Sequence, residues 1–370
     1  MKTKKAVTRN GQIEFWRFVG IIMIVIGHTN KLLDNPPLED VFALWVDFFF
    51  IVTGFFTASS ILKNPNPCNI NTLGSETVTY SLKKIKSFYI FFIFAAITSI
   101  MSKVVLYGFE EVFLNWKIFG SVNDLLMIYG TGFPSMLLTV GEWYLSSMVL
   151  AIFAIYPLAR KYPDLFQNVI APLTAVFLYG IMLHNEGALS DPGTWYVIGI
   201  KGTVRAIAGI SLGFAANRLV NNIKSSPVFE KKLPIAFLTA VDIFAIPFAV
   251  VLMIMGINSK YSSAVIFLLF AGVVTSLSGK SIFTKAFSNK FCLFLGKISL
   301  PVFLCQGTII YLIKAQQNAD AQFNAYCNST GEPVMIAVLC VGTIALALAC
   351  YFICTPLMKL IDKGIAKLKS

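Results

Sequence analysis

Long apolar runs separated by short polar segments are the main pattern along this chain. A helix needs about 20 residues to cross a bilayer. Runs near or above that length fall at 13–32, 39–62, 86–107, 135–158, 169–184, 194–216, 234–256, 261–278, 291–313 and 333–357. The run at 169–184 is short, and 112–128 could form an interfacial helix, so nine and eleven are alternative numbers of spans. The pattern predicts an all-α, polytopic membrane protein with about ten transmembrane helices.

Basic residues between the apolar runs are unevenly distributed. If the N-terminus is cytoplasmic, the basic clusters at the N-terminus, at 83–86, at 231–232 and in the tail at 359–369 all lie inside. The basic residues left outside are Lys31, Lys117, Lys260 and Lys314. Because cytoplasmic loops carry an excess of Lys and Arg, we expect both termini to be cytoplasmic and the protein to be a multi-pass protein of the plasma or inner membrane.

Composition supports the membrane assignment and argues against other classes. The chain is 56% hydrophobic and 13% charged, with a mean hydropathy of +0.74. Its net charge of +12 comes from short clusters between apolar runs, not from one basic face, so we expect a lipid bilayer and no nucleic acid as partner. The seven cysteines follow neither metal-site nor disulfide spacing, so no metal is expected.

We expect a single integral-membrane domain over residues 1–370, because no linker, fixed repeat or low-complexity stretch divides the chain. No appended extracytoplasmic domain is expected. Trp16 and Arg17 interrupt the first apolar run, and no small-residue cleavage site follows it, which favours a retained membrane anchor over a signal peptide.

Two polar residues in the first span share one helix face. Arg17 and His28 are eleven positions apart, about three turns plus 20° and about 16 Å along an α-helix. A lipid-facing arginine costs about 2.5–3.5 kcal/mol, so both side chains should point into a protein-lined tunnel. The alternative is that Arg17 is an interfacial anchor paired with Glu14, and His28 a polar cap. The only other histidine, His184, is expected in an outer loop with no role in the chemistry.

These residue types suit acyl transfer between the two sides of a membrane. An imidazole near the outer end of a helix can act as general base on a hydroxyl group. A guanidinium near the cytoplasmic end can pair with the phosphates of acyl-CoA. The helical rise between Arg17 and His28 is comparable with the reach of a pantetheine arm.

Further polar residues occur in the second and fourth spans. Asp47 is an intramembrane acid, which by default suggests function, although a buried ion pair with Arg205 or Lys201 is an equal alternative. At the outer end of the fourth span, Glu142 precedes Trp143 and Tyr144. Glu142 could orient the imidazole of His28 or be an exposed loop acid, and the two aromatic residues could belong to an interfacial belt.

The sixth and ninth spans also contain polar residues. Lys201 and Arg205 are four positions apart, so their like charges share a face, which makes sense if an anion lies between them. Asp47 or Asp242 could instead be their counter-ion. The ninth span contains the sequence Leu-Gly-Lys-Ile-Ser at 295–299 and a further polar residue, Gln306.

Taken in order, these motifs resemble the acyltransferase type 3 family of multipass membrane enzymes that O-acylate carbohydrates. The resemblance covers roughly residues 10–310. It rests on the Arg17–His28 spacing, on Thr53-Gly54-Phe55 (serine is usual at the first position), on Trp143-Tyr144-Leu145, on Gly209-x-x-x-Gly213 and on 295–299. Leu300 and Phe303 replace tyrosines of the family pattern, and Gln306 stands where a histidine is frequent. Gln306 can form hydrogen bonds but cannot relay a proton.

The resemblance implies an O-acyltransferase that moves an acyl group, acetyl being favoured, from cytoplasmic acetyl-CoA or another acyl-CoA to a carbohydrate. The acceptor could be an exopolysaccharide, an O-antigen or a lipid-linked sugar of the cell envelope. The catalytic residues expected are His28, Glu142 and Asp47. Those expected to bind acyl-CoA are Arg17, Arg205 and Lys201. Those expected to bind the other substrate are Trp143, Tyr144 and Gln306. The alternatives are a transporter or flippase of a glycan or lipid-linked sugar, and a non-catalytic relative serving a synthase complex.

Overall fold

Each apolar run contains a helix in the computed structural model, which describes residues 9–368 except 34–40, 65, 114–116, 187–188, 190, 197–198 and 256–260. The helices that correspond to the runs are α1 (Gly11–Gly27), α2 (Trp45–Leu62), α3 (Leu73–Tyr107), α6 (Glu142–Lys161), α8 (Ala171–Glu186), α9 (Lys201–Ser225), α10 (Lys232–Ile254), α11 (Ser262–Ser278), α13 (Lys290–Ala319) and α15 (Glu332–Leu368). The protein is therefore an all-α, polytopic membrane protein, as the sequence predicts.

Eight of the described helices are long and apolar enough to cross a membrane. Two of the predicted spans do not meet these criteria of length and hydropathy, each for a different reason. Helix α11 is apolar but has only 17 residues. Helix α9 has 25 residues but includes Lys201, Arg205, Arg218 and Lys224, which lower its hydropathy. Most residues of both helices are buried, so α9 does not need a fully apolar surface.

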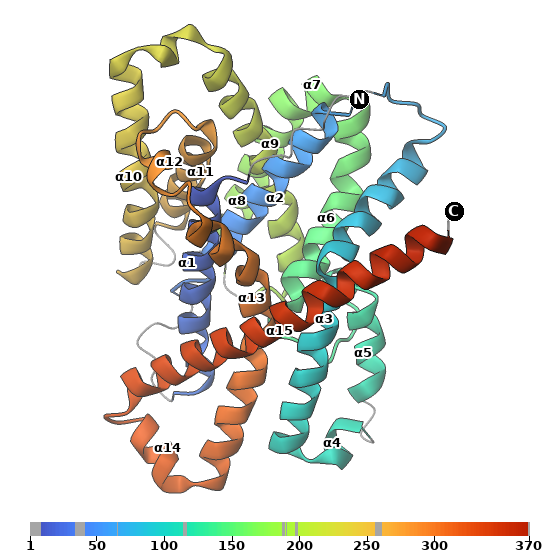
Figure 1. Ribbon diagram of the computed structural model, residues 1–370, viewed down its shortest axis with the longest axis vertical. Helices are drawn as coiled ribbons and strands as arrows, with labels where there is room; N and C mark the ends of the chain where they lie inside the picture. Colours follow the sequence, from blue (N-terminus) through green and yellow to red (C-terminus); the bar gives the residue numbers. More distant parts are fainter. Residues whose placement is uncertain are drawn as a thin grey trace.

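Short elements connect these helices. They are η1 (His28–Lys31), α4 (Phe109–Phe113), α5 (Lys117–Leu125), η2 (Tyr129–Thr131), α7 (Pro163–Leu165), the π-helical η3 (Phe166–Ile170), η4 (Pro227–Glu230), α12 (Phe283–Ala286) and α14 (Ala321–Cys327). β1 (Trp195–Tyr196) and β2 (Gly199–Ile200) form a small antiparallel hairpin before α9. The predicted interfacial segment at 112–128 contains α5. Figure 1 shows α15 crossing the bundle obliquely, with α10 at one margin.

Helices α2 and α9 approach so closely that their backbones touch. A Cβ atom placed on Gly54 would lie 2.0 Å from the carbonyl oxygen of Ile210, and one on Gly213 would lie 2.2 Å from that of Ile51. A Cβ atom placed on Gly209 would likewise lie 2.5 Å from the Cβ atom of Phe50. Small residues allow such contact where no hydrophobic force drives membrane helices together. The Gly209–Gly213 motif therefore positions α2 beside α9.

Helix α1 is fixed at its start and along its length. The side chain of Asn10 caps it by accepting hydrogen bonds from the backbone N–H groups of Gln12 and Ile13, both at 3.0 Å. Further along, Gly20 leaves room for the ring of Trp45 on α2, which a Cβ atom would approach to 2.5 Å. Through α1, residues near Arg17 and residues near His28 are held at different depths of the bundle.

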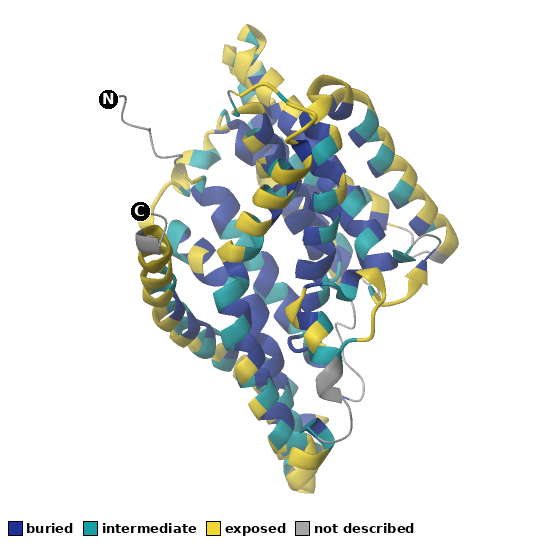
Figure 2. Ribbon diagram, turned by 90° about the vertical axis from the view of Figure 1, so that its right-hand side faces the viewer, coloured by how far each residue is buried: buried dark blue, intermediate teal, exposed yellow. Residues whose placement is uncertain are grey.

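Large apolar side chains on the peripheral helices face outward. Phe244 on α10 is 68% exposed and Phe352 on α15 is 63% exposed, as expected for a surface in contact with lipid. Figure 2 shows buried residues through the middle of the bundle, and exposed ones on the outer faces and at both ends. The basic residues Lys2, Lys4, Lys5, Lys260 and Lys369, used above to orient the chain, lie outside the described residues.

Candidate active site

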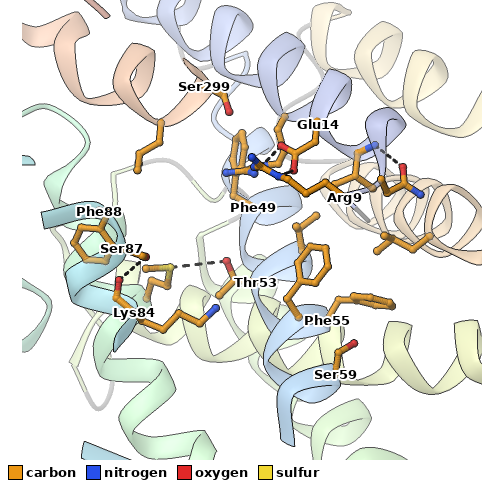
Figure 3. Close-up of a pocket in the computed structure, with 18 of the residues that line it drawn as sticks. Arg9, Glu14, Phe49, Thr53, Phe55, Ser59, Lys84, Ser87, Phe88 and Ser299 are labelled. Carbon is orange, nitrogen blue, oxygen red and sulfur yellow. Dashed lines mark hydrogen bonds and ion pairs between the residues drawn. The ribbon is translucent and has the colours of Figure 1, made fainter. Parts of the chain in front are cut away.

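A large cavity of about 670 Å³ lies between α1, α2, α3, α6 and α13. Basic side chains line one part of it: Arg9, Arg17, Lys63, Lys84 and Lys224. Its deeper part is lined by apolar and aromatic side chains, among them Phe49, Tyr144 and Phe303. In Figure 3, Arg9 and Glu14 lie on one wall of this cavity and Lys84 on the opposite wall. The arrangement suits a ligand with an anionic part and an apolar part.

Arg17 is held by a carboxylate that also holds a second arginine. Its Nη1 donates to Oε2 of Glu14 at 2.9 Å, and Nε of Arg9 donates to Oε1 of the same carboxylate at 2.7 Å. Gly296 on α13 makes room for Glu14, since a Cβ atom there would lie 1.9 Å from Oε2. The Arg17–Glu14 pair left open by the sequence is therefore present, while Arg17 also lines the large cavity and keeps 28% of its side chain exposed.

His28 is paired with Gln306, across 278 residues of sequence. Nδ1 of His28 lies 2.8 Å from Oε1 of Gln306, and Nε2 of Gln306 donates to the carbonyl oxygen of Phe303, also at 2.8 Å. Because the Gln306 amide nitrogen is engaged with a carbonyl, its oxygen accepts from His28. Nδ1 of His28 therefore carries the proton, and Nε2 of the neutral ring is the basic nitrogen.

A second, smaller cavity of about 100 Å³ lies at His28. Other residues that line it include Trp143, Asp191 and Arg205. The small cavity therefore combines an imidazole with an indole, a carboxylate and a guanidinium.

The two cavities share Val46 and Phe303 as lining residues. Arg17 lines only the large one and His28 only the small one. The continuous tunnel expected from the sequence is thus, among the described residues, two cavities at successive depths with a common wall. Phe303 and Val46 are the two residues that line both cavities.

Asp47 and Arg205 form a buried ion pair, which was one of the alternatives open from the sequence. Nη2 of Arg205 lies 2.6 Å from Oδ2 of Asp47, and both side chains are at most 2% exposed. The Tyr179 hydroxyl donates to Oδ1 of Asp47 at 2.7 Å, and Arg205 also donates to the carbonyl oxygens of Ala43 and Leu189 at 2.7 Å. The pair ties α2, α8 and α9 together.

The structure does not bring Arg205 and Lys201 to Arg17. Arg205 lines the small cavity, and Lys201 is buried without lining either cavity described here. Asp47 likewise lines neither. Of the three cations expected to bind acyl-CoA, only Arg17 lies at the large cavity.

Glu142, Trp143 and Tyr144 separate into three environments at the start of α6. Glu142 is fully buried, so the alternative of an exposed loop acid is wrong, and neither oxygen of its carboxyl group has a hydrogen-bond partner among the described residues. Trp143 lines the small cavity and Tyr144 the large one. The Tyr144 ring lies against that of Phe303, with centroids 5.6 Å apart at 86°.

Sequence reasoning missed several residues that line the large cavity. Lys84 was assigned to a loop because hydropathy places the third span at 86–107, but α3 begins at Leu73 and directs Lys84 to the cavity. Lys63 and Lys224 were counted only as topology signals. The expected loop at His184 is the end of α8, where His184 is exposed and lines neither cavity. The described residues hold no group of three or more His, Cys, Asp or Glu that could bind a metal ion.

Comparison with protein families gives one match. Residues 10–352 match the family model described as an acyltransferase domain. Neither the comparison with curated proteins nor that with solved structures gave a match. The matched range contains every residue described above as lining either cavity except Arg9.

Proposed function

Because this chain belongs to the acyltransferase domain family, and is thus a membrane acyltransferase, we propose that it is an O-acyltransferase with acyl-CoA as donor and a carbohydrate as acceptor. The favoured acyl group is acetyl, and the acceptor belongs to the cell envelope or the extracellular space. The observation that carries the proposal is the pair of cavities, one basic and one with a histidine, that meet at Val46 and Phe303.

The large cavity is the proposed donor site. Its volume of about 670 Å³ lies within the range typical of small-molecule sites, about 300–1,000 Å³. Arg17, Lys84 and the other basic residues would bind the phosphates of CoA, with Arg17 contributing a planar guanidinium suited to paired hydrogen bonds. The apolar part would accept the pantetheine arm and place the thioester near Phe303.

The small cavity is the proposed acceptor site. Nε2 of His28 would accept the proton of a sugar hydroxyl while the oxygen attacks the thioester carbonyl carbon. The tetrahedral intermediate then collapses, the C–S bond breaks, and the proton passes from His28 to the departing CoA sulfur. Trp143 offers a flat apolar surface of the kind on which a sugar ring can pack.

The proposed orientation follows the chemistry of the substrates. CoA thioesters are cytoplasmic and highly charged, so the basic cavity would face the cytoplasm, with both termini on that side and the chain in the plasma or inner membrane. Residues 1–370 would then act as a single domain. A transporter or flippase of a glycan or lipid-linked sugar would need a passage for the whole cargo, and the common wall between the cavities gives that alternative no support.

Transfer of label from acetyl-CoA tests the proposed base. Membranes containing wild type, His28→Ala or His184→Ala would be incubated with labelled acetyl-CoA and cell-envelope glycans. We expect His28→Ala to lose about 10²–10⁴-fold of the transfer rate, the usual contribution of a general base. His184→Ala, which removes a histidine outside both cavities, should transfer like wild type. Equal transfer by His28→Ala and wild type would refute the assignment of the base.

Direct binding tests the proposed donor site. Calorimetry with CoA would compare Arg17→Ala with Arg218→Ala, an exposed arginine outside both cavities. A hydrogen bond between charged groups contributes about 1.5–3 kcal/mol, so Arg17→Ala should weaken binding about 10–100-fold. Unchanged affinity in Arg17→Ala, or an equal loss in both variants, would count against a phosphate contact at Arg17.

A further inference from the structure

Phe303 stands at the boundary of the two cavities. It is 5% exposed and lines both the large cavity and the small cavity at His28. Val46, on the facing helix α2, shares this position. Together these two side chains, hereafter the dividing wall, form the floor of the proposed donor site.

The ring of Phe303 is closely packed on the α6 side. Tyr144 packs edge-on against it, with centroids 5.6 Å apart. A Cβ atom on Gly141 would lie 2.4 Å from Cε1 of Phe303, so the ring occupies the space beside this glycine. The Phe303 carbonyl oxygen accepts a hydrogen bond from Gln306. These contacts hold the ring where it lines both cavities.

Close packing at the dividing wall limits the length of the acyl group that can bind beside it. For transfer to occur, the thioester carbonyl must come to the place where the two cavities meet, because His28 lines the other cavity. The acyl chain beyond the carbonyl then has to fit against Val46 and Phe303. In an apolar site, one methylene more or less changes the discrimination between substrates by about 10–200-fold.

We propose that Phe303, together with Val46, determines the acyl chain length of the donor and restricts it to short acyl groups. This inference rests on the proposed function, since it assumes that the large cavity binds acyl-CoA. It adds a specificity-determining residue to that site, at a position that the sequence analysis identifies only as a departure from the family's tyrosine.

The test compares affinities for CoA, acetyl-CoA and hexanoyl-CoA by calorimetry on the purified full-length protein in detergent. Wild type should bind hexanoyl-CoA at least about tenfold more weakly than acetyl-CoA. In Phe303→Leu, and in Val46→Ala, this ratio should fall by about tenfold. Phe294→Leu, a phenylalanine of α13 that contacts Tyr351 and lines neither cavity, is the matched control and should keep the wild-type ratio.

Each outcome bears on a distinct claim. Equal affinity of wild type for the two thioesters, or a ratio unchanged in both wall variants, would overturn the role of Phe303 while leaving the donor site intact. Failure of wild type to bind CoA would overturn the proposed donor site and this inference with it. A thermal unfolding midpoint close to that of wild type ensures that the Leu and Ala variants are folded.

Discussion

His28 donates its Nδ1 proton to Oε1 of Gln306 across 2.8 Å, and this contact sets which imidazole nitrogen is basic. The side chain of Gln306 is fully buried and its amide nitrogen is bound to the Phe303 carbonyl, so the amide cannot rotate to present its nitrogen without losing that bond. Gln306 cannot relay a proton, but it can orient the imidazole. It is thus a positioning residue for the proposed base.

Substitution of Gln306 should lower transfer without removing the proposed base. In Gln306→Ala the imidazole loses a hydrogen bond of about 1 kcal/mol, so we expect a transfer rate at least about fivefold lower. Gln306→His should retain most of the activity, because an imidazole nitrogen can accept the same proton. Initial rates with labelled acetyl-CoA measure both. Wild-type activity in Gln306→Ala would mean that His28 needs no orientation by this residue.

The buried pair of Asp47 and Arg205 should contribute to stability. Removing one partner leaves an unpaired buried charge, so Asp47→Ala should destabilise the protein by about 3–5 kcal/mol. The double variant Asp47→Leu/Arg205→Leu should be less destabilised, because no charge is left unpaired. Unfolding in detergent measures both effects.

The same double variant tests whether the pair has a role beyond stability. If Asp47 and Arg205 are needed only for stability, the folded double variant should still transfer label from acetyl-CoA. A folded but inactive double variant would instead mean that transfer requires Asp47 or Arg205, which lines the small cavity.

The close approach of α2 and α9 predicts a steric effect at Gly54. In Gly54→Ala the new methyl group would meet the backbone carbonyl of Ile210 at 2.0 Å, so the helices must separate and the midpoint of thermal unfolding should fall. Gly180→Ala on α8 is the matched control, because nothing lies within 4 Å of its Cβ position. That change should leave stability equal or raise it by about 0.5–1 kcal/mol. Similar midpoints in the two variants would contradict the close contact.

The proposed orientation can be tested with thiol labelling from outside the cell. Cys68 lies in the connection between α2 and α3, and Ser329 follows α14 at the other end of the bundle. A membrane-impermeant thiol reagent should label Ser329→Cys in intact cells, and should reach Cys68 only in inverted vesicles. Cys68→Ser identifies the signal from Cys68. The reverse pattern would place the basic cavity outside and remove the argument for a cytoplasmic donor.

Hydropathy predicted the membrane-embedded parts of the fold well, because each of those segments must be apolar to lie in lipid. It failed at the helix ends: α3 begins at Leu73, not near 86, and α15 continues to Leu368. Beyond the hydrocarbon a helix can be polar, so no change in hydropathy marks its end. Lys84 was missed at the cavity for this reason.

Motif order identified the family and the residues of the first helix, but not how the site is assembled. Gln306 could be recognised as a substitution in a family pattern, yet its contact with His28 depends on how α13 packs along α1. Likewise, the sequence identifies Phe303 only as a departure from the family pattern, and not as a residue that lines both cavities. Its importance comes from Gly141 and Tyr144 on another helix, which fix its position.

The dividing wall has a consequence for the cell as well as for the substrate. The two residues that line both cavities, Val46 and Phe303, are apolar. Ions and protons from bulk water would therefore meet apolar side chains where the cavities approach each other. Under the proposed orientation, an acyl group could be handed across while the membrane stays electrically insulating.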